Sequence, residues 1–274
     1  MNSPAPLPPL GLVAGHGTFP LELAAKLATR FRLEIVAVRT EASAEIEHYS
    51  PKVTWLQVGR VQAMIDTFKR AGVREVIMAG KVQKLHLFRN FLPDIPTMRT
   101  LAALPDRRDD TLMNGVAGML ADHGITMISQ LKYAAEMLAS AGHLMGPTPN
   151  ARQQKDVAFG CQHAKGIAAL DIGQTVVVQQ QAVLAVEAIE GTDAAIVRGG
   201  ALGSGLATVA KVAKPNQDLR FDVPAFGADT LMTMRRNGCD CLAVEAGLTL
   251  MLQRDRLATL AEEYGITVVG VDLT

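Results

Sequence analysis

The first eighty residues alternate between short apolar runs and segments whose apolar positions recur every three or four residues. The runs at 10–14, 32–38 and 74–79 are typical of buried strands, and the segments at 18–31 and 58–72 are typical of amphipathic helices. Such alternation predicts a doubly wound parallel sheet, which binds its ligands beyond the carboxyl ends of the strands. Gly15, Gly17, Gly80 and Lys81 fall at that edge.

The rest of the chain continues this pattern after an interruption. Residues 84–146 are expected to be largely helical, and the Gly, Pro and Asn residues that follow mark a loop. From 155 onward helices and apolar strands alternate again, up to a last strand at 266–273. We therefore expect two α/β domains. Residues 1–132 form the N-terminal, Rossmann-like domain with a parallel sheet, and 133–274 form a C-terminal α/β catalytic domain.

Charge and cysteine content narrow the classes of function. The 274 residues contain 27 basic and 27 acidic side chains, which argues against nucleic acid as a partner, because duplex binding normally needs a basic face. The three cysteines fit neither a disulfide framework nor a four-ligand zinc site. No stretch approaches the roughly 20 apolar residues that span a bilayer. The sequence predicts a soluble cytoplasmic protein that can also work at a membrane surface.

A glycine turn joins the first predicted strand to its helix. In GLVAGHGTFP, Gly15 and Gly17 flank His16, and such a turn can present backbone N–H groups to a phosphate. The third glycine of the dinucleotide fingerprint is absent, because Pro20 occupies the spaced position. A tight turn without any ligand remains the alternative.

The first of two acidic segments is VEAIEGTD, which contains Glu187, Glu190 and Asp193. Mg²⁺ prefers oxygen ligands and is usually held by one or two carboxylates together with substrate phosphates and water. Asp193 also stands in the first turn of a predicted helix, after Thr192, where a carboxylate favours the helix dipole. A capping role is therefore the alternative for Asp193.

The second acidic segment is KPNQDLRFD, and it places Asp218 and Asp222 on either side of Arg220. The alternating spacing puts these three side chains on one face of an extended segment. A solvated edge strand with an internal salt bridge is the alternative. Lys211 and Lys214 precede the two aspartates, and a diphosphate bound with Mg²⁺ needs such a mixture of cations and anions.

Several longer motifs resemble a known family. GLVAGHGTFPLELA, VIMAGKV, VLAVEAIEGTDAAIVRGG, KPNQDLRFDVPAFGADT and CLAVEAGLTL are similar to the UDP-2,3-diacylglucosamine pyrophosphatases of lipid A biosynthesis, of the type unrelated to calcineurin-like phosphoesterases. The resemblance covers essentially the whole chain, and it implies a substrate cleft between the two α/β domains. It implies a Mg²⁺-dependent cytoplasmic hydrolase that splits UDP-2,3-diacylglucosamine into UMP and 2,3-diacylglucosamine 1-phosphate. The nucleotide-sugar lipid also implies transient contact with the inner leaflet of the cytoplasmic membrane.

The motifs and the resemblance together nominate the site residues. The expected catalytic residues are Asp222, Asp218, Asp193 and Arg220, and the expected metal ligands are Asp222, Asp193 and Glu187. The expected substrate contacts are Gly15, His16, Gly17, Lys81, Glu190, Thr192, Lys214 and Thr230. A non-catalytic nucleotide-sugar or lipid-binding regulator on the same scaffold is the alternative function, and an NAD(P)-dependent oxidoreductase rests on the glycine turn alone. We expect a homodimer, the commonest assembly of soluble oligomeric enzymes.

Overall fold

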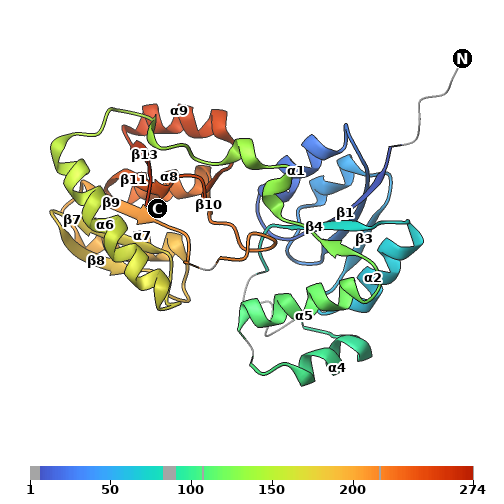
Figure 1. Ribbon diagram of the computed structural model, residues 1–274. Coiled ribbons are helices and arrows are strands. Elements are labelled where there is room, and N and C mark those ends of the chain that lie inside the picture. The colour runs from blue at the N-terminus through green and yellow to red at the C-terminus, as the bar shows by residue number, and fades with distance from the viewer. Residues whose placement is uncertain (1–6, 83–90, 107, 216, 274) are drawn as a thin grey trace, which may run out of the picture. The chain divides into compact units, whose positions relative to one another are not determined.

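The computed structural model describes residues 7–82, 91–106, 108–215 and 217–273, which fall into two compact units (Figure 1). Unit 1 comprises the chain up to Ala134 together with Asp218–Phe221, and unit 2 comprises Ala135–Gln217 together with Asp222–Thr274. The chain therefore leaves unit 2 after Gln217, contributes Asp218–Phe221 to unit 1, and returns at Asp222.

Unit 1 is built on a parallel sheet with the strand order β3-β2-β1-β4-β5, which confirms the predicted N-terminal α/β fold. Its strands are β1 (Pro9–Ala14), β2 (Arg32–Val38), β3 (Val53–Leu56), β4 (Glu75–Ala79) and β5 (Thr126–Met127). Its helices are α1 (Phe19–Leu27), α2 (Val61–Arg70), α4 (Ile95–Ala103) and α5 (Asp109–Ala121). The strand order reverses direction between β1 and β4, so ligands of such a sheet bind beyond those two strand ends.

Both faces of this sheet are covered, which explains why its strands are almost continuously apolar. On one face, Val13, Val36 and Val76 share a core with Phe68 of α2 and Leu120 of α5. The α1 helix buries its own apolar side on the opposite face, as expected for right-handed β–α–β crossovers.

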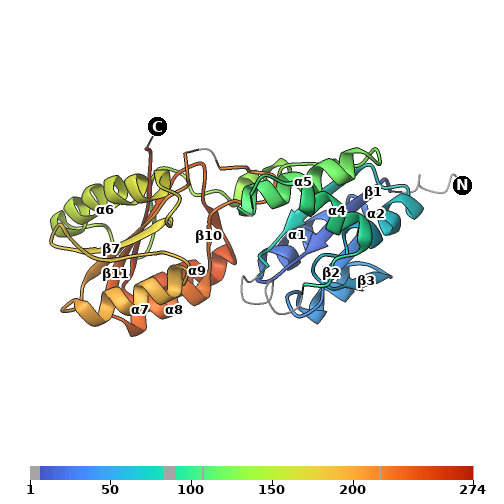
Figure 2. The same ribbon diagram turned by 90° about the horizontal axis from the view of Figure 1, so that it is seen from below.

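Unit 2 contains a six-stranded mixed sheet with the order β6-β13-β11-β9-β7-β8. Its strands are β6 (Gly142–Met145), β7 (Thr175–Gln179), β8 (Ala182–Val186), β9 (Ala207–Lys211), β11 (Cys239–Glu245) and β13 (Thr267–Val271). The short strands β10 (Ala225–Phe226) and β12 (Leu250–Met251) form a separate parallel pair. Helix α6 (Ala151–Ala169) covers one face, and α7 (Thr192–Leu202), α8 (Ala228–Arg236) and α9 (Arg254–Tyr264) cover the other (Figure 2).

The expectation that residues 84–146 are largely helical is wrong for its second half. Helices α4 and α5 form, but strands β5 and β6 and short 3-10 turns follow them. Strand β6 is extended because it pairs antiparallel with β13, more than 120 residues later in the sequence. No local sequence pattern therefore predicts this strand. Residues 83–90, which belong to the same stretch, lie outside the described residues.

Helix α6 begins at Ala151, earlier than the predicted start at residue 155. Asn150 accepts a hydrogen bond from the Gln153 N–H at 3.0 Å, and the Gln153 side chain accepts one from the Asn150 N–H at 3.0 Å. This reciprocal capping box satisfies two N–H groups that would otherwise lack partners at the helix start. Among the helices that the structure describes, none is both long and apolar enough to cross a bilayer.

Candidate functional site

The carboxyl ends of β9 and β11 carry two buried charged residues. Lys211 ends β9 and Glu245 ends β11, and Lys211 pairs with Val244 across the parallel ladder. Both residues are almost fully removed from water, with exposed fractions of 5% for Lys211 and 2% for Glu245. Burying an ion without a partner is very costly, so the contacts of these residues are informative about the site.

The Lys211 ammonium lies at the start of helix α7. Its Nζ donates to Thr192 Oγ1 at 2.8 Å, and Thr192 Oγ1 donates to Glu187 Oε1 at 3.0 Å. Thr192 is the first residue of α7, and Gly191 before it has a φ of 87°, a value that glycine adopts without strain. A helix N-terminus presents unpaired N–H groups and partial positive charge, so a lysine beside it favours an anion such as a phosphate.

The three carboxylates of the first acidic segment have different environments. The Glu187 carboxylate accepts from Thr192 and from the Gln174 N–H at 3.4 Å. The pKa of Glu190 lies below its ordinary value, because the Glu190 backbone N–H and the Arg198 guanidinium donate hydrogen bonds to its carboxylate. Arg198 and Glu190 also form an ion pair. Asp193 is exposed in the first turn of α7. The alternative reading of Asp193 as a residue that favours the helix dipole agrees with this position.

The second acidic segment is not extended, so the predicted common face of Asp218, Arg220 and Asp222 is wrong. Residues 219–221 form a turn in which the Phe221 N–H donates to the Asp218 carbonyl oxygen at 3.2 Å. The polar and apolar residues alternate, as in a strand, but no neighbouring strand pairs with this segment among the described residues. Instead, Ser129 Oγ and the Gln130 N–H donate to the Leu219 carbonyl oxygen, which ties the turn into unit 1.

Asp218 and Arg220 form a local salt link within unit 1. Arg220 Nη2 lies 2.6 Å from Asp218 Oδ2 and 2.6 Å from Asn114 Oδ1 of helix α5. The hydrogen bond from Arg220 lowers the pKa of Asp218, although partial burial opposes the shift. The internal salt bridge that the sequence left open is therefore present, and it does not lie on an edge strand.

The remaining candidates of this half belong to unit 2. Asp222 is half-buried and begins the stretch that continues into β10 and α8. Thr230 lies in the first turn of α8 and is only 9% exposed. Lys214 Nζ forms an ion pair with Asp171 Oδ1 at 2.5 Å.

The glycine turn of unit 1 is held by β4. The Gly15 N–H donates to the Ala79 carbonyl oxygen at 2.8 Å, and the His16 N–H donates to the Lys81 carbonyl oxygen at 2.7 Å. A Cβ at Gly15 would lie 2.7 Å from the Lys81 carbonyl oxygen, so the close approach of the two strand ends explains this glycine. These two N–H groups are engaged by protein. Gly17 and the side chains of His16 and Lys81 are exposed at the same strand ends.

The expected metal ligands Glu187, Asp193 and Asp222 do not form a ready-made metal site in the part of the chain that the structure describes. Within the described residues, no group of three or more His, Cys, Asp and Glu side chains could hold a metal ion by itself. Mg²⁺ commonly takes one or two carboxylates and completes its shell with water and phosphate oxygens. Asp193 is exposed and Asp222 is half-buried, whereas the Glu187 carboxylate is engaged by Thr192 beside the Lys211 ammonium.

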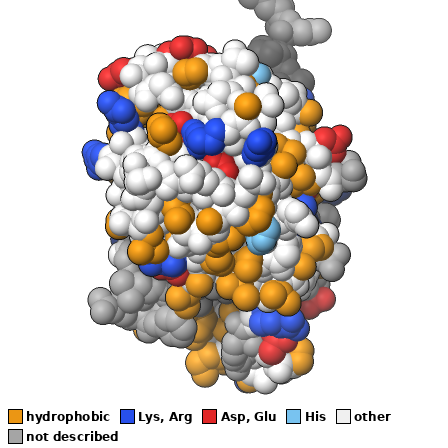
Figure 3. All heavy atoms as spheres, turned by 90° about the vertical axis from the view of Figure 1, so that its left-hand side faces the viewer, with side chains coloured by type: hydrophobic (Ala, Val, Ile, Leu, Met, Phe, Trp, Pro, Cys, Tyr) orange, Lys and Arg blue, Asp and Glu red, His pale blue; other side chains and the backbone are white. Residues whose placement is uncertain are grey.

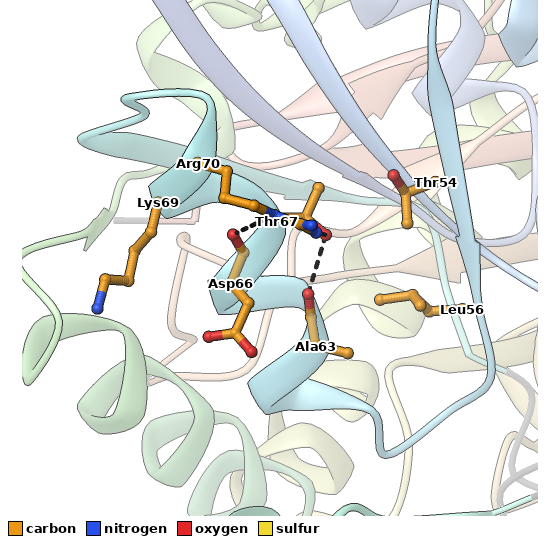
Figure 4. A pocket seen from close by; sticks show the side chains of 7 residues that line it. All are labelled: Thr54, Leu56, Ala63, Asp66, Thr67, Lys69 and Arg70. Atoms are coloured by element: carbon orange, nitrogen blue, oxygen red, sulfur yellow. Dashed lines mark hydrogen bonds between the residues drawn. The ribbon is translucent and has the colours of Figure 1, made fainter.

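A shallow hollow of about 560 Å³ lies on unit 1 against β3 and α2 (Figure 4). The side chains around it include none of the expected site residues; they are Thr54, Leu56, Ala63, Asp66, Thr67, Lys69 and Arg70. The Arg70 guanidinium donates to the Asp66 carbonyl oxygen at 3.2 Å, so this cation is held by its own helix.

Three charged residues near these strand ends were missed as site residues: the buried Lys211 and Glu245, and the partly exposed Lys165, whose Nζ lies 2.6 Å from Glu245 Oε1. Lys165 and Glu245 were not singled out at all, and Lys211 was noted only as one of two basic residues before the second acidic segment. The available signal was a charged residue at the carboxyl end of an otherwise apolar strand, as in ATVAK and CLAVE. Such a residue needs a specific partner when the strand is buried.

Comparisons with known proteins cover nearly the whole chain. Residues 9–137 match the model of the LpxI N-terminal domain, and residues 140–269 match that of the LpxI C-terminal domain. The UDP-2,3-diacylglucosamine pyrophosphatase LpxI of Caulobacter vibrioides is 30% identical over 275 residues, which cover 96% of this chain and 97% of that protein.

Two solved structures also show a limited similarity. CobK precorrin-6A reductase is 15% identical with a TM-score of 0.32, covering 97% of this chain and 88% of its own. The structure of gox2253 is 13% identical with a TM-score of 0.32, covering 96% and 89%. Neither score is high enough to support a conclusion about fold or function.

Proposed function

Because the chain belongs to the LpxI family, we propose that it hydrolyses UDP-2,3-diacylglucosamine to UMP and 2,3-diacylglucosamine 1-phosphate with Mg²⁺ as cofactor. The Caulobacter vibrioides relative bears the name of a pyrophosphatase for this nucleotide-sugar lipid. One observation assigns the proposed activity to particular residues: the buried Lys211 ammonium lies 2.8 Å from Thr192 Oγ1 at the start of α7.

The proposed role of this edge of unit 2 is to bind the diphosphate. The Lys211 ammonium and the N–H groups of the first turn of α7 together offer positive charge from a side chain and from the backbone. Glu187 orients Thr192 and balances the lysine charge when no substrate is bound. Because Lys211 is largely shielded from water, its attraction for phosphate oxygens is less screened than that of a surface lysine.

Two carboxylates are proposed to hold the cofactor. Asp222 and Asp193 would each supply carboxylate oxygens to Mg²⁺, and the diphosphate would supply others. The bound ion would neutralise phosphate charge and so ease attack on phosphorus. Asp222 is our first choice for the carboxylate that orients the attacking water, and Lys214 is proposed to bind a phosphate oxygen after release from Asp171.

The bond that breaks is the phosphoanhydride P–O bond, and water supplies the oxygen that replaces it. We propose that water attacks the sugar-side phosphorus, so that UMP leaves as the nucleotide product. Hydrolysis in ¹⁸O-labelled water tests this choice, because the label should appear in 2,3-diacylglucosamine 1-phosphate. Label in UMP would contradict it and assign the attack to the other phosphorus.

The reaction itself is tested by measuring UMP release from UDP-2,3-diacylglucosamine. We expect Mg²⁺-dependent release that EDTA abolishes and that Asp222→Asn reduces on the order of hundreds-fold. The alternative, a regulator that binds the ligand without turnover, predicts thermal stabilisation by the substrate and no UMP. Full activity of Asp222→Asn would remove this carboxylate from the mechanism.

For the substrate supply, we propose transient contact with the inner leaflet of the cytoplasmic membrane. Helix α4 exposes the apolar side chains Ile95 (67%) and Met98 (55%), and the neighbouring Arg99 is exposed as well. Apolar side chains beside a cation suit an interface with anionic lipid. Flotation with anionic vesicles should be reduced by Met98→Glu, and unchanged flotation would remove this helix from the contact.

We also propose a homodimer, in line with the usual assembly of enzymes of this size. Figure 3 shows hydrophobic side chains distributed over one face of the molecule, and unit 2 exposes several large ones. They include Ile189, Val197, Leu202 and Leu206. Light scattering during gel filtration should give twice the 29.2 kDa chain mass, and a single-chain mass would contradict the dimer.

A further inference from the structure

Beyond the residues proposed to meet the substrate, unit 2 contains a buried ion pair at the same sheet edge. Glu245 Oε1 lies 2.6 Å from Lys165 Nζ, which comes from helix α6. Glu245 is 2% exposed by residue, and the Lys165 side chain is 29% exposed. A buried pair of this kind adds little stability compared with apolar side chains, so its presence calls for another explanation.

Both members of the pair bind the backbone of one residue. Glu245 Oε2 accepts from the Ala213 N–H at 2.7 Å, and Lys165 Nζ donates to the Ala213 carbonyl oxygen at 3.3 Å. Ala213 is fully buried and lies just beyond the end of β9, so its polar groups have left the strand pairing. Buried backbone groups need partners, and here two charged side chains provide them.

Ala213 stands between the two lysines of the site. Lys211 is two residues before it, and Lys214 follows it directly. We propose that Glu245 and Lys165 are positioning residues that clamp Ala213 and thereby fix the directions of Lys211 and Lys214 for the diphosphate. This inference rests on the proposed function, because it assigns these lysines to the substrate.

The same helix offers a matched control pair. Asp156 is 1% exposed, pairs with Arg152 at 3.2 Å, and accepts from two backbone N–H groups of the β7–β8 turn. That turn, at Gln180 and Gln181, follows the last residue of β7, whereas Thr175 at the first residue of β7 pairs with Lys211. Because β7 is antiparallel to β9, the turn and Lys211 lie at opposite ends of the strands. Asp156→Asn therefore perturbs an equally buried carboxylate of unit 2 away from the proposed site.

The test compares Glu245→Gln, Lys165→Met and Asp156→Asn in the full-length enzyme. We expect the first two to lower kcat for UMP release about 10- to 100-fold, since small displacements of positioning groups have effects of that size. KM should change much less than kcat. Asp156→Asn should lower the melting temperature and leave kcat near the wild-type value. Lys165→Arg keeps a positive charge and N–H donors but has a larger, planar head group, so it should restore part of the activity lost in Lys165→Met.

Amide hydrogen exchange gives a readout that does not depend on turnover. Exchange in a peptide spanning 212–215 should accelerate in Glu245→Gln and Lys165→Met, while the 179–182 turn should keep its protection. Because Lys165 is partly exposed, Lys165→Met remains informative if Glu245→Gln does not fold. The clamp proposal would be overturned if Lys165→Met or Glu245→Gln kept the wild-type kcat, or if Asp156→Asn lowered kcat by the same factor as they do. Either result would leave the proposed function standing. Absence of UMP release by the wild-type enzyme would instead overturn the proposed function on which it rests.

Discussion

Replacing Lys211 by methionine separates the proposed function of this lysine from any role in stability. Methionine has a similar length and removes only the charge and the donors that Lys211 offers to Thr192 at 2.8 Å. A unit charge about 4 Å from a phosphate charge is worth about 4 kcal/mol at an effective dielectric constant of about 20. Since about 1.4 kcal/mol corresponds to a factor of ten, the upper limit is on the order of a thousandfold in rate.

Competition by water and by Glu187 reduces that limit. We therefore expect Lys211→Met to lower kcat/KM about 100- to 1,000-fold, the range seen when one preorganised electrostatic group is removed. Stability should fall as well, because removing one partner of a largely buried charge pair leaves the Glu187 carboxylate without its balancing charge. The melting temperature should fall by roughly 2–4 °C for each kcal/mol lost, while the protein stays folded at the assay temperature.

The assay measures UMP release at saturating Mg²⁺ together with thermal unfolding of the same preparations. Lys26→Met is the control, because Lys26 is a half-buried lysine of unit 1 whose Nζ donates to the Tyr133 carbonyl oxygen at 2.5 Å. It should keep wild-type kcat/KM. A Lys211→Met enzyme that is fully active, or one that loses activity only in proportion to the fraction unfolded, would refute the reasoning.

Three further predictions concern the fold and its ionisable groups. Gly80 has a φ of 84°, and a Cβ there would lie 2.6 Å from the His16 carbonyl oxygen, so Gly80→Ala should cost about 1–3 kcal/mol in a urea titration; an unchanged midpoint would contradict this close approach. Arg220 lowers the pKa of Asp218, so their link stabilises the fold above the ordinary aspartate pKa of about 4 and is lost as the pH falls through the lowered value. Arg220→Ala should thus lower the melting temperature slightly at pH 7 and progressively less below pH 4, and a pH-independent difference would speak against the link. Burial raises the pKa of the three free thiols to about 12, so a thiol reagent at pH 8 should label them only after unfolding, and rapid labelling of the native protein would contradict their burial; they are Cys161, Cys239 and Cys241.

The local patterns predicted the regular elements well and the non-local contacts poorly. The first strands and helices of unit 1 are visible in the sequence because each carries its own period, and the parallel sheet follows from their alternation. Strand β6 was missed because its pairing partner is far away in the sequence. The segment around Arg220 was read as extended because its alternation imitates a strand, whereas contacts with Gln130 and Asn114 hold it as a turn in unit 1.

The candidate site shows the same division. The sequence placed Gly15 and Lys81 at the carboxyl edge of the predicted sheet, and the structure adds that β1 and β4 are neighbours there, with His16 pairing with Lys81. The sequence did not reveal that Glu187 accepts a hydrogen bond from Thr192, which in turn accepts one from the buried Lys211. These partners depend on the register of β9 against its neighbouring strands, which no local pattern encodes. The roles assigned to Asp222, Asp193 and Mg²⁺ stay predictions.

The most direct test of the central claim is a crystal structure of the Asp222→Asn variant with UDP-2,3-diacylglucosamine and Mn²⁺ in place of Mg²⁺. The account predicts diphosphate oxygens within hydrogen-bonding distance of Lys211 Nζ and of the first N–H groups of α7, with anomalous density for the metal against the same phosphates. A diphosphate bound elsewhere, with the Lys211–Thr192 contact of 2.8 Å unchanged and no phosphate oxygen near it, would contradict the account.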